Sequence, residues 1–589
     1  MKKSWVKRCA ATGLCGALLL TGACGKATGN TLDTDKTQIY INVYDGGTGT
    51  DWIKQEATRF NANQEDYEIV IEGEKRSDQT IRAEVVGGTG KYSAYFTVGA
   101  VWQDFIYRDR LVDLSGILER KTEGEERTIG SKLKEPELWK QVGSKNGQGQ
   151  YLLPYADSMT GLVFDYDQFV QNGWLTKLKG NDESAKSALT EQGIVFEVNA
   201  AKNELRFVSA DHEVNYEAGD PILSAGKDGK YGTYDDGQPQ TFAEFDAMLT
   251  RILATNGAKP FVYPSTMTTY VDDIVYAYFY QLAGEDATKA LFQYDSNGVA
   301  LPMKDGSSKV IALENGYEVY GMQAIYDTLE FAEKYFNNSA YLHNSLNGAT
   351  NHKDAQRNFL YGFTDEYMDS AMLLEGVWWE NEARPTFDAV SRIDSNRGYG
   401  KVEYRYMLLP EIPGQKGIAG NEKGTVFATK DTGSFFVVKE KDTKKTEILL
   451  DFLTQTLSDR ALRNFTSLTG IPRMFEYEMT AEDYARMTPF AKNAYQIYND
   501  TENVKIVRQY LERYREPLYS LTSLATWAIF PFNDAGIVTG KPLLGLINNA
   551  KVLSPSDPLG SVFDGISGAY SASDWEDYLA EARRLGFYA

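Results

Sequence analysis

The stretch Gln38–Asn61, QIYINVYDGGTGTDWIKQEATRFN, decides how the chain begins to fold. Its first seven residues alternate in the manner that predicts a β-strand. A glycine-rich turn, Gly46–Gly49, breaks this pattern, and apolar side chains then recur at helical spacing from Trp52 to Phe60. The stretch therefore predicts a strand, a tight turn and a helix.

The same order of elements continues along the chain. Residues 68–72 predict a second strand, residues 79–86 a helix and residues 94–98 a third strand. Strand, helix, strand, helix, strand is the pattern of an α/β lobe with a largely parallel sheet. Residues 151–155 lead into residues 161–165 as a strand would that leaves one lobe and enters another. We therefore expect an α/β fold of two lobes.

An insertion interrupts the second lobe at about residues 177–240, where the sequence pattern differs from that of the rest of the lobe. Within it, residues 194–198 and 204–208 flank the turn Asn199–Asn203, which predicts a β-hairpin. Beyond it, helical patterns return at residues 241–255, 271–283 and 317–336.

The first 23 residues have the features of a bacterial secretion signal. Basic residues lie within the first eight positions, and a short run of small and apolar residues, Ala10–Ala23, follows. Small residues precede Cys24 as in a lipobox, although Thr21 stands where that pattern prefers a leucine-like residue. We expect residues 1–23 to be removed and Cys24 to be lipidated. The alternative is an ordinary signal peptide that is cleaved near Ala23.

Composition excludes several classes of protein. The net charge of −21 argues against nucleic acid as a partner, because phosphate binding needs a basic surface. All three cysteines lie in the first 24 residues, so the mature chain would hold neither a disulfide nor a zinc–cysteine cluster. No G-x-S-x-G motif or cysteine nucleophile is present. Glu380 and Glu382 would share one side of a strand, unlike the opposed carboxylates of a glycosidase.

Six segments carry a resemblance to a known family. They are residues 43–61, 153–165, 370–379, 406–410, 433–438 and 470–473, in this order. Together they resemble the extracellular solute-binding proteins of carbohydrate ABC transporters, the family that includes maltose-binding protein, in its Gram-positive lipoprotein form. The resemblance implies a two-lobed periplasmic-binding-protein-like (Venus flytrap) fold with an interlobe hinge and a cleft that closes on ligand.

The resemblance also implies a domain organisation. A flexible tether, residues 24–37, would join the lipid to the fold. Lobe 1 would comprise residues 36–157 and 410–472, and lobe 2 residues 158–409 and 473–589, with the insertion on lobe 2. The protein would be a monomer at the extracellular face of the cytoplasmic membrane, attached through its lipid alone. It would pass a sugar, with the size of the chain favouring an oligosaccharide, to the permease subunits of an importer.

Aromatic rings that stack on a sugar, and polar groups that bond its hydroxyls, are the side chains to seek in such a cleft. The candidate ligand-binding residues are Gly47, Thr48, Trp102, Tyr155, Asp157, Tyr270, Asp272, Glu375, Trp378, Trp379 and Arg473. Because Trp378 and Trp379 are adjacent, one should face the cleft and the other the core. Packing in the core is the alternative for each aromatic residue, and pinning of the hinge is the alternative for Arg473.

The segment Asp228–Gly237 is compatible with a calcium loop, with Asp228, Asp235 and Asp236 as ligands, although it does not match the EF-hand pattern. The alternative is a glycine-punctuated turn with solvated aspartates. We expect no cofactor to be required, and any calcium would be structural. Two other functions remain open: a surface glycoside hydrolase, and a lipoprotein that binds polysaccharide without transport.

Overall fold

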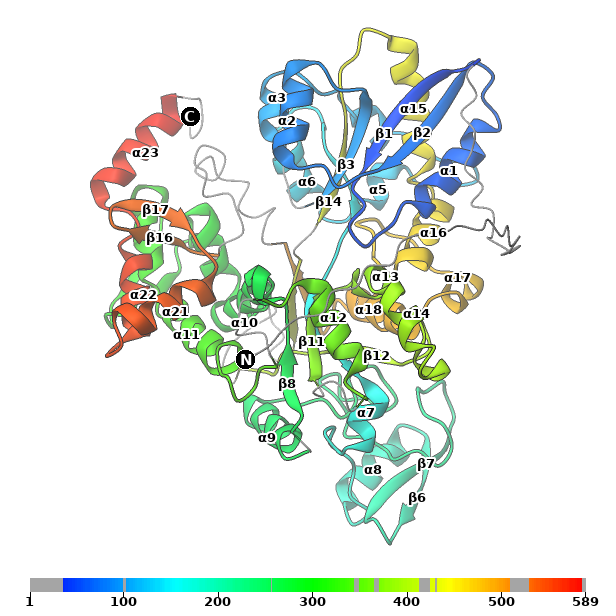
Figure 1. The fold of residues 1–589 in the computed structure, drawn as a ribbon, viewed down its shortest axis with the longest axis vertical. Helices are drawn as coiled ribbons and strands as arrows, with labels where there is room; N and C mark the ends of the chain where they lie inside the picture. Colours follow the sequence, from blue (N-terminus) through cyan, green and yellow to red (C-terminus); the bar gives the residue numbers. More distant parts are fainter. Residues whose placement is uncertain are drawn as a thin grey trace, which may run out of the picture.

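The computed structural model describes residues 35–584 except 99–101, 256, 344–348, 365–369, 413–423, 430–431 and 509–528. The expected cleavage site and Cys24 therefore lie outside the described residues. Two sheets, each covered by helices, form an upper and a lower lobe in Figure 1. The predicted two-lobed α/β fold is confirmed.

Lobe 1 is built on a five-stranded sheet in the order β2-β1-β3-β14-β4. Its strands are β1 (Thr37–Val43), β2 (Tyr67–Gly73), β3 (Tyr92–Val98), β4 (Leu153–Ala156) and β14 (Gly433–Val437). The first three strands run parallel, whereas β14 pairs antiparallel with both β3 and β4. The predicted opening strand, turn and helix are β1, residues 44–50 and α1 (Asp51–Asn61). Helix α1 buries Trp52, Ile53 and Phe60 because they share one face.

The other helices of lobe 1 cover the two faces of this sheet. They are α2 (Asp78–Gly87), α3 (Gln103–Tyr107), α4 (Ser115–Leu118), α5 (Ile129–Lys132), α6 (Pro136–Gly143), α15 (Thr443–Gln455) and α16 (Asp459–Thr469). Helices α15 and α16 pack beside α1, so segments that are far apart in sequence complete this lobe.

Lobe 2 is built on the sheet β15-β13-β5-β11-β8, with β12 also paired to β5. Its strands are β5 (Thr160–Asp165), β8 (Lys259–Val262), β11 (Ser370–Gly376), β12 (Tyr404–Met407), β13 (Thr425–Ala428) and β15 (Val504–Val507). Its helices include α7 (Tyr166–Gln171), α9 (Phe242–Leu253), α10 (Thr269–Gln293), α11 (Gln323–Phe331), α12 (His352–Tyr361), α13 (Trp379–Glu382), α14 (Arg384–Val390), α17 (Ala481–Ala485) and α18 (Pro489–Asn499).

Two predicted lobe boundaries differ from the structure. The chain does not return to lobe 1 at residue 410, because β13 still pairs with β5 and β15 of lobe 2. The return follows β13, and β14 is the first strand back in lobe 1. At the last crossing, Phe475 still bridges to Leu133 of lobe 1, so lobe 2 resumes a few residues beyond 473. Sequence patterning missed both points because they depend on long-range strand pairing.

The insertion has a small core of its own. Helix α8 (Glu183–Glu191) packs on the hairpin of β6 (Ile194–Asn199) and β7 (Glu204–Ala210), which confirms the predicted hairpin. Its buried apolar residues form a cluster separate from the main core: Leu178, Ala185, Leu189, Ile194, Leu205, Phe207, Ile222 and Tyr231. The insertion lies at the end of lobe 2 that faces away from lobe 1, at the bottom of Figure 1.

The C-terminal segment packs against the flank of lobe 2. It contains β16 (Pro531–Asp534), β17 (Ile537–Gly540), α21 (Leu543–Leu553), α22 (Pro558–Ser567) and α23 (Ala572–Arg584). Helices α21 and α22 contact α10 and α11, and a carboxylate oxygen of Asp272 accepts a hydrogen bond from the Leu543 backbone N–H. Among the described residues, none of the helices combines the length and apolar character that crossing a membrane requires.

Candidate functional site

The two lobes touch where the loop after β1 meets the residues after β11. A Cβ atom built on Gly47 of lobe 1 would lie 3.1 Å from both Cβ and Cδ1 of Trp378 of lobe 2. Gly47 also has φ of +96°, a conformation that favours glycine. Because Gly47 has no side chain, the lobe 1 backbone can approach the ring of Trp378 in lobe 2 closely. The two lobes therefore contact each other at this point.

Trp378 lies beside a second aromatic ring. The ring of Tyr270, at the start of α10, packs edge-on against it with centroids 6.4 Å apart. Trp378 is only 6% exposed in this arrangement, and its ring also covers Gly376, where any side chain would clash. Thr48, next to Gly47, directs its hydroxyl at the Tyr44 carbonyl, 3.5 Å away. Gly47, Thr48, Tyr270 and Trp378 are thus brought together from both lobes.

Two carboxylates flank Trp378 in the sequence, Glu375 and Glu382. Glu375, which is fully buried, accepts hydrogen bonds from Gln356 Nε2 at 3.2 Å and from the Gly376 backbone N–H at 3.1 Å. The same Gln356 nitrogen donates to Glu382 at 3.0 Å. Lys75 of lobe 1 lies 3.8 Å from the other Glu382 oxygen, across the interlobe boundary. Ring faces beside acceptors and donors form the set of groups that recognises a polyhydroxylated ligand.

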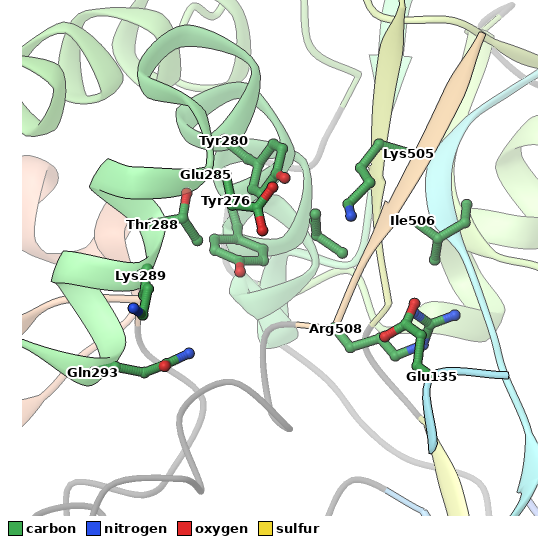
Figure 2. A pocket seen from close by; sticks show the side chains of 11 residues that line it. Glu135, Tyr276, Tyr280, Glu285, Thr288, Lys289, Gln293, Lys505, Ile506 and Arg508 are labelled. Atoms are coloured by element: carbon green, nitrogen blue, oxygen red, sulfur yellow. The ribbon is translucent and has the colours of Figure 1, made fainter. Parts of the chain in front are cut away.

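A second part of the interlobe region is the α10–β15 hollow, of about 100 Å³ (Figure 2). Its lining residues are Glu135 of lobe 1, Tyr276, Tyr280, Glu285, Thr288, Lys289 and Gln293 of α10, and Lys505, Ile506, Val507 and Arg508 at β15. Figure 2 shows the two tyrosines on one side and Arg508 with Glu135 on the other. Like the Trp378 contact, the hollow combines aromatic rings of lobe 2 with a residue of lobe 1, here Glu135.

A buried ion cluster forms beside this hollow. Asp157, which is fully buried at the first crossing, receives Nε and Nη2 of Arg508 at 3.2 and 2.5 Å. The Tyr498 hydroxyl donates to the same carboxylate at 2.7 Å, and Arg508 also pairs with Glu135 of lobe 1. Burial alone would lower the pKa of Arg508, but the Asp157 and Glu135 carboxylates hold this pKa well above its ordinary value. The cluster fixes the crossing strand, a structural role that differs from the predicted ligand contact at Asp157.

Three predicted aromatic residues belong to the core instead of the cleft. Trp102 stacks on Phe105 at 5.1 Å and donates its indole N–H to Thr97. Tyr155 stacks on Trp52 inside lobe 1. Trp379 is fully buried among rings that belong to lobe 2: Phe359, Phe387, Tyr404 and Phe490. Their rings complete apolar cores, so the prediction that Trp102 and Tyr155 line the cleft is wrong. Of the two adjacent tryptophans, one of which was expected in the core, Trp379 is the core residue.

Arg473 and Asp272 also differ from the prediction. The Arg473 side chain is fully buried, with its guanidinium 4.8 Å from the centre of the Phe465 ring and 5.7 Å from that of Trp52. None of its three nitrogens has a hydrogen-bond partner among the described residues. Burial lowers its pKa to about 10. Asp272 is buried against the start of α21, so it joins the C-terminal segment to α10.

The aspartates of the insertion are bonded to protein donors. Asp235 accepts from the Lys227 backbone N–H at 2.6 Å and from the Thr233 hydroxyl at 2.8 Å. Asp236 accepts from the Tyr216 hydroxyl and the Gly232 N–H, and burial raises its pKa to about 7. Asp228 accepts from the Lys230 N–H. Within the described ranges, no three acidic, histidine or cysteine side chains are placed to hold a metal, so geometry gives the calcium prediction no support.

Sequence reasoning missed Gln356, Glu382 as a cleft group, Lys75 and Arg508. Gln356 lies on an ordinary amphipathic helix, α12, and only the fold turns it towards Glu375. Arg508 gives no local signal, because its partners Glu135 and Asp157 are more than 300 residues away. The pairing of Glu382 with Lys75 likewise depends on how the lobes meet.

Comparison with solved structures identifies proteins of similar fold. No family model matches the sequence, and no curated protein matches it. A solved structure described as "SBP RafE in complex with raffinose" has a TM-score of 0.50 and 12% identity, and the match covers 91% of this chain and 100% of that one. RafE from Streptococcus pneumoniae in its apo form (TM-score 0.49, 12% identity, 92% and 99% covered) and a chitin oligosaccharide binding protein (0.49, 12%, 94% and 99%) are also similar. The chain therefore has the two-lobed fold of a solute-binding protein.

Proposed function

We propose that this protein captures a sugar, in particular an oligosaccharide, in the interlobe cleft and delivers it to the permease of an ABC importer. The observation that carries the proposal is the contact of Trp378 with Gly47 across the lobes, beside Tyr270 and the Gln356-bound carboxylates. Aromatic faces and hydrogen-bonding groups drawn from two lobes suit a ligand that is enclosed when the lobes close. The raffinose complex of a protein with the same fold supports the class of ligand.

Binding without hydrolysis is part of the proposal. Glu375 and Glu382 both accept a hydrogen bond from one nitrogen of Gln356, and Glu375 is fully buried, so we expect this pair not to flank a glycosidic bond. Glycoside hydrolysis needs two carboxyl groups on opposite sides of the scissile bond. We therefore expect a bound oligosaccharide to be recovered intact.

Calorimetric titration against a panel of neutral oligosaccharides tests the proposal, with chromatography of the recovered sugar as a check for cleavage. Trp378→Ala should weaken binding by at least about tenfold, because it removes the ring at the centre of the contact. Tyr107→Ala, which removes a 41%-exposed tyrosine of α3 in lobe 1, is the matched control and should bind normally. A panel without any binding, or with cleaved products, would overturn the proposal.

We also propose that Cys24 carries a lipid and holds the protein, as a monomer, at the outer face of the cytoplasmic membrane. The basic start, the short apolar run and the small residues before Cys24 support this. Metabolic labelling with a fatty acid should mark the protein, and Cys24→Ser should abolish the label and release the protein into the medium. Labelling that persists in Cys24→Ser would contradict the assignment.

A further inference from the structure

A cavity of about 110 Å³ lies at the hinge, beside α13. Lobe 1 contributes the end of α16, Ser467–Gly470. Lobe 2 contributes Val377, Glu380, Arg384, Tyr399, Arg486, Thr488, Phe490 and Ala491. Because residues of both lobes line this hinge cavity, its shape depends on how the lobes are arranged.

Glu380 is the acidic side chain that lines the hinge cavity, and it is 3% exposed. One carboxyl oxygen, Oε2, accepts a hydrogen bond from the Thr488 hydroxyl at 2.5 Å. The other, Oε1, has no hydrogen bond of normal geometry in the described part of the chain. Burial raises the pKa of Glu380 to about 7, and Thr488, Arg384 and the Gly400 N–H lower it by less. A buried carboxylate with one oxygen that lacks a hydrogen bond of normal geometry is costly, and the neutral acid costs less.

The charged groups around Glu380 do not neutralise it. Arg384 donates to Asn381 Oδ1 and to the Tyr399 hydroxyl, at 3.0 Å each. Arg486 pairs with Asp483 at 2.5 Å. The C-terminus of α16, which carries the negative end of its helix dipole, forms the wall from lobe 1 and further disfavours a carboxylate.

The short helix α13 connects this acid to the cleft. Trp378 immediately precedes the helix, two positions before Glu380, and it contacts Gly47 of lobe 1. Asn381 Nδ2 donates to the Thr469 carbonyl of α16 at 2.6 Å, and Glu382 faces Lys75. Trp378, Asn381 and Glu382 of this one helical turn therefore each contact lobe 1, and the buried Glu380 lies among them in the sequence.

We propose that Glu380 makes closure of the lobes proton-linked: it is held as the neutral acid while the hinge cavity is closed, and it ionises when opening admits water. Because the closed form holds the proton more tightly, closure is favoured fully below the ordinary pKa of a glutamate and is lost as the pH rises through about 7. Where closure captures a sugar, which rests on the function proposed above, capture takes up a proton.

Small-angle X-ray scattering of the ligand-free protein between about pH 6 and about pH 8 tests the link without any sugar. The radius of gyration should rise with pH. Glu380→Gln, which mimics the neutral acid, should remain compact throughout. Glu482→Gln, which alters an exposed acid on α17, is the matched control and should behave as the unaltered chain does. Equal expansion of Glu380→Gln and the unaltered protein, or no expansion at all, would overturn the proposal.

A second variant covers the case in which Glu380→Gln does not fold. Arg384→Gln removes a cation that lowers the pKa of Glu380, so the midpoint of the expansion should move to higher pH. A midpoint that is unchanged or moves down would contradict the link.

Titration with a sugar then separates the two proposals. Affinity should fall by up to about tenfold per pH unit above pH 7 in the unaltered protein, and by much less in Glu380→Gln. If no sugar binds at any pH, the proposed function fails, while the scattering result still decides the role of Glu380. If a sugar binds equally well at all pH values, the proposed function stands and the proton link fails.

Discussion

Trp378 and Trp379 are neighbours that are both buried but contact different parts of the molecule. Trp378 meets Gly47 across the lobes, whereas Trp379 fills the core of lobe 2. Trp379→Ala should lower the free energy of unfolding by about 3–5 kcal/mol, because it leaves a large cavity. Trp378→Ala should lower it less, because this ring packs at the boundary between the lobes, and should also weaken sugar binding. Urea denaturation followed by calorimetry on each variant measures both effects, and the reverse pattern would contradict the placement.

Gly47 sets how closely the lobes approach. Its φ of +96° disfavours any other residue, and a Cβ atom there would lie only 3.1 Å from the Trp378 side chain. Gly47→Val should therefore hold the lobes apart and weaken sugar binding by about tenfold or more, since about 1.4 kcal/mol of strain is enough for a factor of ten. Gly49→Val, at an open position of the same turn with φ of +64°, controls for backbone strain and should bind better than Gly47→Val. Calorimetry compares the two.

Arg473 presents a different problem at this scale, a guanidinium buried without a hydrogen-bond partner among the described residues. Arg473→Met keeps much of the side-chain volume and removes the buried charge. We expect the free energy of unfolding to rise by about 1–3 kcal/mol, with sugar affinity unchanged. A loss of stability in urea denaturation would show that the guanidinium has a partner in the folded protein.

At the scale of elements, the insertion is tied to lobe 2 at one end and independent at the other. Its last part bonds to β12, where Gln238 bonds to the Tyr406 carbonyl and the Leu408 N–H, while α8, β6 and β7 share a separate core. Leu205→Ala, in that core, should cost about 2–5 kcal/mol locally and leave sugar binding intact. Val208→Ala on the exposed side of β7 is the control. In Leu205→Ala, but not in Val208→Ala, amide hydrogen exchange should become faster within residues 177–236.

Local pattern was enough to predict elements but not their long-range partners. The strand at Gln38–Tyr44, the helix from Trp52 and the hairpin of the insertion follow from spacing alone, and the structure contains all three. The same reasoning could not separate Trp102, which is core, from Trp378, because both follow a strand. Only tertiary packing decides which ring meets the other lobe. Gln356, Lys75 and Arg508 were missed for the same reason.

At the scale of the whole molecule, the Asp157–Arg508 pair joins the crossing strand to the edge of lobe 2. Arg508→Met leaves Asp157 buried without its cation and should lower the free energy of unfolding by about 3–5 kcal/mol. Adding Asp157→Asn should restore part of this loss. Arg120→Met, which removes an exposed pair with Asp451 inside lobe 1, should cost about 1 kcal/mol or less. Urea denaturation of the four proteins measures these differences, and equal losses from Arg508→Met and Arg120→Met would contradict the assignment.

Strand β14 has a consequence for the synthesis of the protein. It lies between β3 and β4, and β4 pairs with no other strand of the described sheet. A ribosome must therefore add some 280 residues beyond β4 before that strand gains its neighbour. Lobe 1 therefore stays incomplete while nearly three quarters of the chain is made, and a chain cut short before β14 would leave β4 without a partner strand.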